Sequence, residues 1–472
     1  MKQQYINGTW CNAQNQNTWD LTNPANEEII AKIPYGNDLD FLHAMEFAVP
    51  AFKTWSKTTP YFRGDILKKT ADFIRKNVKD FATDTILETG KPRNEAEGEW
   101  QVAANLFEWY AEEGKRSYGR VVPTNRTDKR SHIIYQPIGV VGVITAWNFP
   151  AYNPARAVAA ALAAGCTVIL KGSEFTPLSG FRIAQALHES GIPKGVFQVI
   201  NGESDKIGNA MLQHPELRKI SFTGSTRVGK ILMDGASLHN TKLSLELGGN
   251  APVIIENDIN VKEIANQAVI AKLRNCGQVC VAPQRFYIHE DIFSEFIAEA
   301  KTTMEKLTLG DNSGTDLHLG PLINQKQQEH TLNLIEIAQK QGGNLLLGGK
   351  KLDKGYFVSP ALIQAKQEQE FIKEEVFGPI MIVIPFENKE QVLDWANDTI
   401  YGLASYVFTE SLKKANFYAE NLEFGMVGIN EWAAHGTEVP FVGIKSSGMG
   451  HESGSEGMKE YMEMKLISYG GM

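Results

Sequence analysis

The stretch from residue 139 to residue 246 alternates between short apolar runs and segments with helical spacing, and this rhythm limits the fold more than any other feature of the chain. Residues 140–146 form a continuous apolar run, as expected of a strand that is buried on both faces of a sheet. Strands are expected at 140–146, 166–170, 196–200, 219–222 and 243–246, with helices at 154–164, 177–190, 206–212 and 226–235 between them. This alternation predicts a doubly wound α/β sheet of parallel strands. Ligands of such sheets bind beyond the carboxyl ends of the strands.

A second α/β set follows Gly249, and the flanks of the chain look different. The second set is expected to have strands at 253–255, 286–289, 380–385 and 404–408. The first 115 residues show mainly helical spacing. Residues 117–136 are polar and rich in turn residues, and residues 459–469 alternate partly with a period of two. A terminal strand of this kind pairs either with another subunit or with its own domain.

Composition argues against several classes of protein. The 472 residues include 47 Lys and Arg against 55 Asp and Glu, a net charge of −8, so nucleic acid and anionic membranes are poor partners. The four cysteines are too few for a disulfide framework, and no His lies at metal-ligand spacing beside them, so no metal site is expected. We read no secretory signal and no membrane-spanning run, so a cytoplasmic location is expected.

A candidate phosphate site lies where residues 220–225 pass from a strand into a helix. Helix N-termini present free N–H groups to anions. Gly224 lets the backbone approach closely, and the Ser225 hydroxyl can donate a further hydrogen bond. A P-loop is excluded because Ile231 stands where its metal-binding Ser or Thr is required. The alternative is a tight turn between strand and helix that holds no ligand.

Lys171 and Glu174 follow the strand at 166–170 directly. A carboxylate at the carboxyl end of a strand can bind both hydroxyls of an adenosine ribose, and it repels a 2′-phosphate. The alternative for Glu174 is a solvated loop carboxylate.

Three further side chains have the chemistry of an acyl-transfer site. Cys280 lies in a loop of small residues and is a nucleophile if nearby groups stabilise its thiolate, although most cysteines are simply small buried hydrophobic residues. Glu246 ends an apolar strand, where a carboxylate is costly unless it is paired or serves as a base near neutral pH. Asn148 follows the first buried strand and either donates to a developing oxyanion or caps a turn.

Six short strings of the sequence occur in a fixed order: WNFP, KGSE, FTGST, LELGG, NCGQVC and EEVFGP. With them the chain resembles the NAD(P)-dependent aldehyde dehydrogenase superfamily, from about Tyr5 to its last residue. The resemblance implies an α/β fold of two doubly wound parallel-sheet domains with a small β oligomerisation arm, assembled as a homodimer or homotetramer. The dinucleotide-binding domain would comprise 1–115 and 137–247, the catalytic domain 248–440, and the arm 116–136 and 455–472.

The resemblance also implies roles for single residues. Cys280 resembles the nucleophile, Glu246 the base that activates water for deacylation, and Asn148 the oxyanion donor, together with the Cys280 backbone N–H. The cofactor contacts would be Trp147, Lys171, Glu174, Gly224, Ser225, Glu375 and Phe377. Members that transfer the acyl group to coenzyme A lack the counterpart of Glu246, so its presence implies a free carboxylic acid as product. Glu174 implies a preference for NAD that still allows NADP.

The string GMVGIN, the spacing that follows it and the YGG ending resemble succinate-semialdehyde dehydrogenases. In that group two arginines bind the distal carboxylate, and Arg156 and Arg274 fall at the matching positions; guanidinium groups suit carboxylates. The alternative for either is a structural ion pair. The Ser that completes the site is missing, and His435 lies in that stretch as a possible donor. Other aldehydes, 2-oxoglutaric semialdehyde and uncharged ones included, remain open, as does a catalytically silent protein on this fold.

Overall fold

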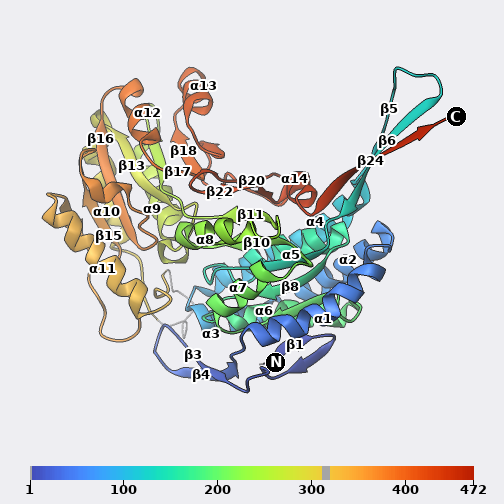
Figure 1. The fold of residues 1–472 in the computed structure, drawn as a ribbon. Coiled ribbons are helices and arrows are strands. Elements are labelled where there is room, and N and C mark those ends of the chain that lie inside the picture. The colour runs from blue at the N-terminus through green and yellow to red at the C-terminus, as the bar shows by residue number, and fades with distance from the viewer. Residues whose placement is uncertain (1–2, 311–318, 472) are drawn as a thin grey trace.

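Two α/β units and a projecting arm make up the chain in the computed structural model, which describes residues 3–310 and 319–471 (Figure 1). The first unit is built on an eight-stranded sheet in the order β2-β1-β9-β8-β7-β10-β11-β22. Its strands are β1 (Gln4–Ile6), β2 (Thr9–Cys11), β7 (Val140–Ile144), β8 (Thr167–Lys171), β9 (Phe197–Ile200), β10 (Leu217–Thr223), β11 (Lys242–Glu246) and β22 (Gly448–Met449). The central strands β9, β8, β7, β10 and β11 are parallel, and the edge strands β1, β2 and β22 are antiparallel to their neighbours.

Helices pack on both faces of this sheet. They are α1 (Asp38–Trp55), α2 (Pro60–Lys76), α3 (Val78–Thr89), α4 (Arg93–Glu113), α5 (Tyr152–Ala164), α6 (Pro177–Glu189), α7 (Ser204–Gln213) and α8 (Thr226–Ala236). Successive residues of β8 point to opposite faces, so Val168 and Leu170 join one hydrophobic core and Ile169 joins the other. The Ala-rich α5 is buried almost throughout because its small side chains let α4 and the sheet approach closely.

The second unit contains a seven-stranded sheet in the order β14-β15-β16-β13-β12-β18-β19. Its strands are β12 (Ala251–Ile255), β13 (Pro283–His289), β14 (Asn344–Leu347), β15 (Ala361–Gln364), β16 (Ile380–Phe386), β18 (Ala404–Phe408) and β19 (Met426–Ile429). They are parallel except for β14. The helices of this unit are α9 (Val261–Leu273), α10 (Glu290–Met304), α11 (Gln325–Lys340), α12 (Lys389–Asn397) and α13 (Leu412–Asn421).

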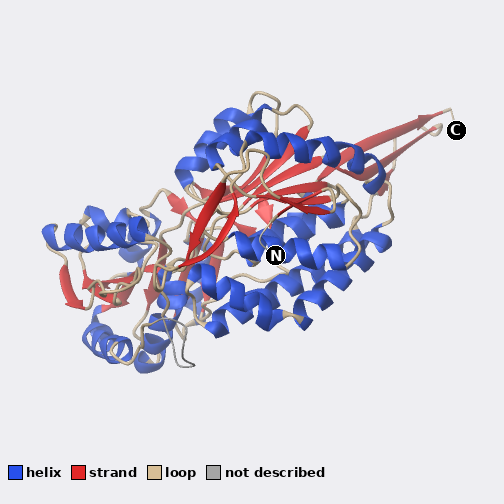
Figure 2. Cartoon of the chain, turned by 90° about the horizontal axis from the view of Figure 1, so that it is seen from below, coloured by secondary structure: helices blue, strands red, loops and turns tan. Residues whose placement is uncertain are grey.

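The arm is a three-stranded antiparallel sheet in the order β24-β6-β5, and it extends away from both units (Figures 1 and 2). Its strands are β5 (Arg120–Val122), β6 (Lys129–Pro137) and β24 (Met462–Gly470). The C-terminal strand pairs with β6 along its whole length, from Met462 opposite Pro137 to Gly470 opposite Lys129. Large apolar side chains stand exposed on the arm, with Leu466 65% accessible. The helix α14 (Gly454–Lys459) precedes β24.

Short strand pairs complete the structure. They are β3 (Thr18–Thr22) with β4 (Ile29–Pro34), β17 (Tyr401–Gly402) with β21 (Ile444–Lys445), and β20 (Phe441–Val442) with β23 (His451–Glu452). None of the helices within residues 3–310 and 319–471 has both the length and the apolar character that crossing a membrane requires.

The predicted α/β fold with a β arm is confirmed, and two details differ. The first 34 residues contain four strands where mainly helical structure was expected. These strands are only 3 to 6 residues long, too short for a sequence period to reveal. The sheets are also not wholly parallel, because β1, β22 and β14 add antiparallel edges. Edge pairing of this kind depends on which segments meet in space, and local sequence does not encode it.

Candidate active site

A cavity of about 770 Å³ opens at the carboxyl ends of β7, β8, β10 and β11. Parallel strands bring these ends to one edge of the sheet, where doubly wound folds bind ligands. Ten residues singled out in the sequence line this cavity: Trp147, Asn148, Lys171, Glu174, Gly224, Ser225, Glu246, Cys280, Glu375 and Phe377. The fold thus brings together segments more than 200 residues apart.

The loop that carries Cys280 is held by close backbone contacts. It follows α9 through a short turn at Arg274–Gly277, in which Asn275 (φ 48°) and Cys276 (φ 56°) adopt left-handed conformations. Gly277 (φ 74°) has no room for a side chain, since a Cβ there would overlap the Gly378 carbonyl. Gly249 is restricted in the same way by the carbonyl of Cys280. These contacts seat the cysteine at the junction of the two units.

The Cys280 thiol lies in a poorly solvated environment. Burial, with smaller contributions from Glu246 and Glu375, raises the pKa of Cys280 to about 12, and Arg156 and Arg274 oppose this shift. At neutral pH the side chain is therefore a thiol, and a base must accept its proton before it can attack a carbon atom.

Glu246 lines the same cavity and is a buried carboxyl group. Its side chain ends β11 and is almost fully buried, and its Oε2 accepts no hydrogen bond from the described residues. Burial raises the pKa of Glu246 well above that of an ordinary carboxyl; Arg156 opposes this shift and Glu452 adds to it. An unpartnered carboxylate oxygen in a cavity leaves a position where water or substrate can donate.

The amide of Asn148 has a defined orientation. Asn153 Nδ2 donates to its Oδ1 (3.2 Å), and its own Nδ2 donates to the backbone carbonyl of Gln278 (3.1 Å). A carbonyl can only accept, so Nδ2 must face the cysteine loop. An amide nitrogen carries two hydrogens, and the second remains for an oxygen bound beside Cys280.

The opposite end of the cavity carries the groups expected for a dinucleotide. Lys171 Nζ donates to Glu174 Oε2 (3.1 Å) and to Ser204 Oγ (2.6 Å). Burial lowers the pKa of Lys171, and Glu174 opposes the shift. Ser225 caps α8 by accepting from the Val228 N–H (3.3 Å), and the first turn of this helix lines the cavity.

Glu375 and Phe377 border the same cavity from the second unit. Glu375 Oε1 accepts from the Gly249 N–H (2.9 Å), and burial raises the pKa of Glu375 to about 7. The Phe377 ring meets Trp147 edge to face, with 5.6 Å between ring centroids. Polar groups at both ends, a helix N-terminus and a volume within the usual range for ligand sites fit an NAD-type dinucleotide. No group of three or more His, Cys, Asp or Glu side chains suited to a metal ion occurs in the described ranges.

The three predicted substrate residues lie outside the lining of this cavity. Arg156 is buried, pairs with Glu452, and stacks its guanidinium 4.4 Å from the centre of the Phe441 ring. His435 stacks on the same ring at 5.9 Å. Arg274 is exposed, lies 5.4 Å from the centre of the Phe149 ring, and borders a second, mainly apolar cavity of about 540 Å³.

The charges of both arginines nevertheless reach the reactive thiol and His435. Arg156 and Arg274 each lower the pKa of Cys280 against the effect of burial. Burial lowers the pKa of His435, and both arginines lower it further. Both arginines therefore lie within electrostatic range of Cys280 and of His435.

Several residues that support this site lie outside the short strings at the ends of the predicted strands. Lys91, Glu99 and Asn275 hold the backbone around Asn148, and Glu452 pairs with Arg156. Their sequence neighbourhoods carry no ligand-like pattern, because the groups that they hold between residues 148 and 156 lie at least 52 residues away in the chain. For Glu99 the one available signal is that a charged residue stands on the buried face of a helix, where charged residues are rare.

Comparisons with known proteins agree with this geometry. Residues 10–467 match the model of the aldehyde dehydrogenase family. The chain is 38% identical to the NADP(+) succinate-semialdehyde dehydrogenase of Escherichia coli, covering 99% of this chain and 98% of that one. It is also 38% identical to a glutarate-semialdehyde dehydrogenase of Pseudomonas aeruginosa (100% and 98% covered). Betaine aldehyde dehydrogenase from Staphylococcus aureus in complex with NAD+ superimposes with a TM-score of 0.97 at 33% identity, covering 100% of this chain and 95% of that one. The chain belongs to the aldehyde dehydrogenase family.

Alkylation of Cys280 by iodoacetamide in the cofactor-free protein is expected to accelerate about tenfold per pH unit between about pH 7 and 9, because the thiolate fraction rises by that factor well below the pKa. Mass spectrometry of the peptide containing Cys280 gives the rate, with Cys280→Ser as the control. A rate that levels off below about pH 8 would show that the thiolate is already formed.

Proposed function

We propose that this aldehyde dehydrogenase oxidises a small aldehyde with a distal carboxylate, succinic semialdehyde foremost, to the free acid, with a preference for NAD over NADP. One observation carries the proposal: Cys280, Glu246 and Asn148 share one cavity with the dinucleotide groups, and two guanidinium groups act on the same thiol. The relatives named for succinate and glutarate semialdehydes support the substrate class.

The residues divide the reaction between them. The Cys280 thiol gives its proton to solvent water, and the thiolate adds to the aldehyde carbon. Asn148 Nδ2 donates to the oxygen as it becomes anionic, an interaction whose loss typically costs about 2.7–4 kcal/mol of barrier. Bound NAD(P)+ supplies the acceptor for the electron pair and hydrogen that this carbon loses. Glu246 then takes a proton from the water that attacks the resulting Cys280 thioester and releases the acid.

The cofactor groups come from two sides of the cavity. Lys171, Glu174 and Ser225 would hold the adenosine half, and Glu375, Phe377 and Trp147 the nicotinamide half. Glu174 would accept from ribose hydroxyls and repel a 2′-phosphate. Its contact with Lys171 moderates that repulsion, so we expect NADP to be used less efficiently rather than refused.

Domain organisation and assembly are part of the same proposal. Residues 1–115 and 137–247 would bind the dinucleotide, 248–440 would supply the nucleophile, and 116–136 with 455–472 would form the arm. The exposed apolar side chains of the arm support pairing with a second copy as a homodimer or homotetramer. Light scattering of the purified chain gives the number of subunits.

The defining experiment measures kcat/KM for succinic semialdehyde and for butanal, each with NAD and NADP. The proposal expects the highest value for succinic semialdehyde with NAD. A higher value for butanal would point to an uncharged substrate. A higher value for 2-oxoglutaric semialdehyde, measured in the same way, would assign that aldehyde as the substrate. If no aldehyde leads to reduction of NAD or NADP, the chain is a catalytically silent binding protein on this fold.

Replacing Glu246 by Gln should slow steady-state turnover by about 10²-fold or more, because the amide cannot take the proton of water. A first burst of NADH should survive, since it forms before the thioester is hydrolysed. Stopped-flow absorbance separates the two phases. An unchanged steady-state rate would mean that another group is the base.

Replacing Glu174 by Gln should raise kcat/KM for NADP relative to NAD by about tenfold, because one repulsive charge disappears. The matched control is Glu203→Gln, which removes a carboxylate paired with Lys206 outside the cavity lining. Steady-state kinetics with both cofactors measures the ratio. The same ratio in both variants would exclude Glu174 as the selecting group.

Replacing Arg274 by Ala should raise KM for succinic semialdehyde about tenfold or more and leave KM for butanal within about twofold, because only the first substrate has a carboxylate to bind. Arg126→Ala, which removes an arginine paired with Asp128 on the arm, serves as the control. Equal losses with both aldehydes would make Arg274 a structural residue.

A further inference from the structure

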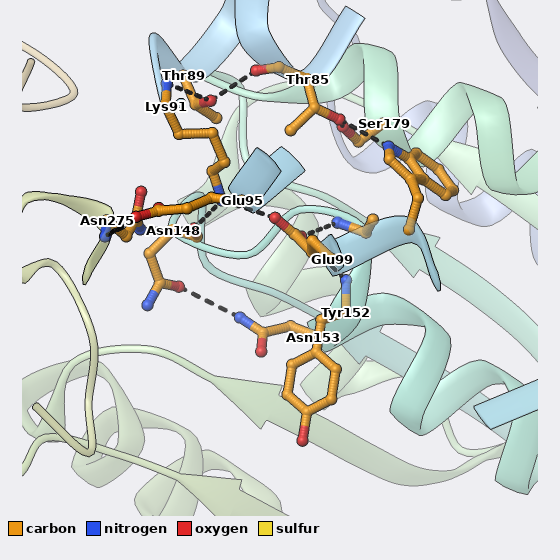
Figure 3. A network of polar contacts seen from close by, with 12 residues as sticks. Thr85, Thr89, Lys91, Glu95, Glu99, Asn148, Tyr152, Asn153, Ser179 and Asn275 are labelled. Carbon is orange, nitrogen blue, oxygen red and sulfur yellow. Dashed lines mark hydrogen bonds and ion pairs between the residues drawn. The ribbon is translucent and has the colours of Figure 1, made fainter. Parts of the chain in front are cut away.

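One buried ion pair contacts both sides of the turn that carries Asn148 (Figure 3). Lys91 Nζ donates to Glu99 Oε2 (2.6 Å) and to the backbone carbonyl of Asn148 (3.0 Å). Glu99 Oε1 accepts from the N–H groups of Ala151 (2.7 Å) and Tyr152 (3.1 Å), at the start of α5. The side chains of Lys91 and Glu99 are 1% and 2% exposed, so water does not compete for these contacts.

The same turn is tied to the nucleophile loop. Asn275 Nδ2 donates to the Asn148 carbonyl (2.9 Å), so that oxygen accepts from Lys91 and Asn275 together. The Asn275 N–H in turn donates to both carboxylate oxygens of Glu95 (3.2 and 3.0 Å), which holds the left-handed turn five residues before Cys280. Figure 3 shows Glu95 and Glu99 on opposite sides of Lys91.

Stability alone is a weak reason to keep such a pair. Two charges lose their hydration on burial, and apolar replacements of similar shape are often neutral or stabilising. The pair makes three hydrogen bonds to the backbone between 148 and 152. Apolar side chains could not replace them, because these directed bonds fix where the Asn148 backbone lies. The side-chain amide, already oriented by Asn153 and Gln278, then points to one place beside Cys280.

We propose that Lys91 and Glu99 are positioning residues that hold the Asn148 amide where the oxyanion forms. This inference rests on the proposed function of Asn148. Neither side chain lines the cavity or touches the reacting atoms, so both act through the backbone at 148–152. Misplacement of an oxyanion donor should lower kcat and leave aldehyde and cofactor binding nearly intact.

The test is a double-mutant cycle with Lys91→Met, which keeps the length of the side chain, and Asn148→Ala. Lys91→Met is expected to lower kcat about tenfold to 10²-fold, with KM for the aldehyde changed by less than about twofold. In the Asn148→Ala background the same change should cost less than about threefold, because the donor that it positions is gone. Lys340→Met, which removes an exposed lysine paired with Glu336, is the matched control.

The rate at which iodoacetamide alkylates Cys280 serves as a second measurement, because general damage to the site would change this rate. Its reaction with Cys280 forms no oxyanion, so Lys91→Met should alkylate within about twofold of the parent rate. A parallel fall of alkylation and kcat, or an unchanged kcat, would overturn the positioning role, as would equal losses from Lys91→Met in both backgrounds. If Asn148→Ala itself keeps full kcat, the proposed oxyanion role of Asn148 is wrong, and the positioning inference is wrong with it. Additive losses from Lys91→Met and Asn148→Ala would instead refute the positioning role alone.

A second variant covers the case in which Lys91→Met does not fold. Glu99→Gln removes the charge that anchors Lys91, and its amide oxygen can still accept from the Ala151 and Tyr152 N–H groups. It should show the same non-additivity with Asn148→Ala at a smaller loss of kcat. Additive losses in this cycle would also overturn the proposal.

Discussion

The active site depends on one constraint, the buried carboxyl of Glu246, whose Oε2 accepts no hydrogen bond from any residue that the structure describes. Isolated buried charges cost several kcal/mol unless they are paired or neutralised, so proteins seldom place one at the end of a core strand. Here burial raises the pKa of Glu246; Arg156 opposes this shift, and Glu452 adds to it. The same poor solvation keeps Cys280 as a thiol, so base and nucleophile are tuned by one environment.

The large hydrophobic cores of the two units offset the free-energy cost of burying this carboxyl group. The parallel strands are buried on both faces, and the helices around them supply the apolar contacts of two hydrophobic cores in the first unit alone. The free energy gained by packing these cores offsets two local costs: the left-handed backbone at Asn275 and Cys276, and the Glu246 oxygen that lacks a hydrogen-bond partner among the described residues. The glycines at 249 and 277 allow the close backbone approaches that place the Cys280 loop beside the cavity that Glu246 also lines.

The sequence revealed those site residues that lie within short strings at the ends of predicted strands. Trp147, Asn148, Lys171, Glu246 and the residues at 224–225 belong to this class, because a parallel sheet places all such ends at one edge. It did not reveal Lys91 and Glu99. Lys91 binds a backbone carbonyl 57 residues away, and Glu99 binds a backbone N–H group 52 residues away. It also missed the N-terminal strands, because three residues show no measurable period.

By itself the sequence determined the α/β class and the sheet edge where a ligand is expected, since these follow from local periodicity. The roles predicted for Cys280, Glu246 and Asn148 came from the family resemblance of the short strings that contain them. The tertiary structure alone decided how those groups are tuned. Burial of Cys280 and Glu246, the pairing of Arg156 with Glu452, and the exposure of Arg274 arise from segments that meet only after folding. Solvation and charge depend on every neighbour in three dimensions, and no window of the chain contains them.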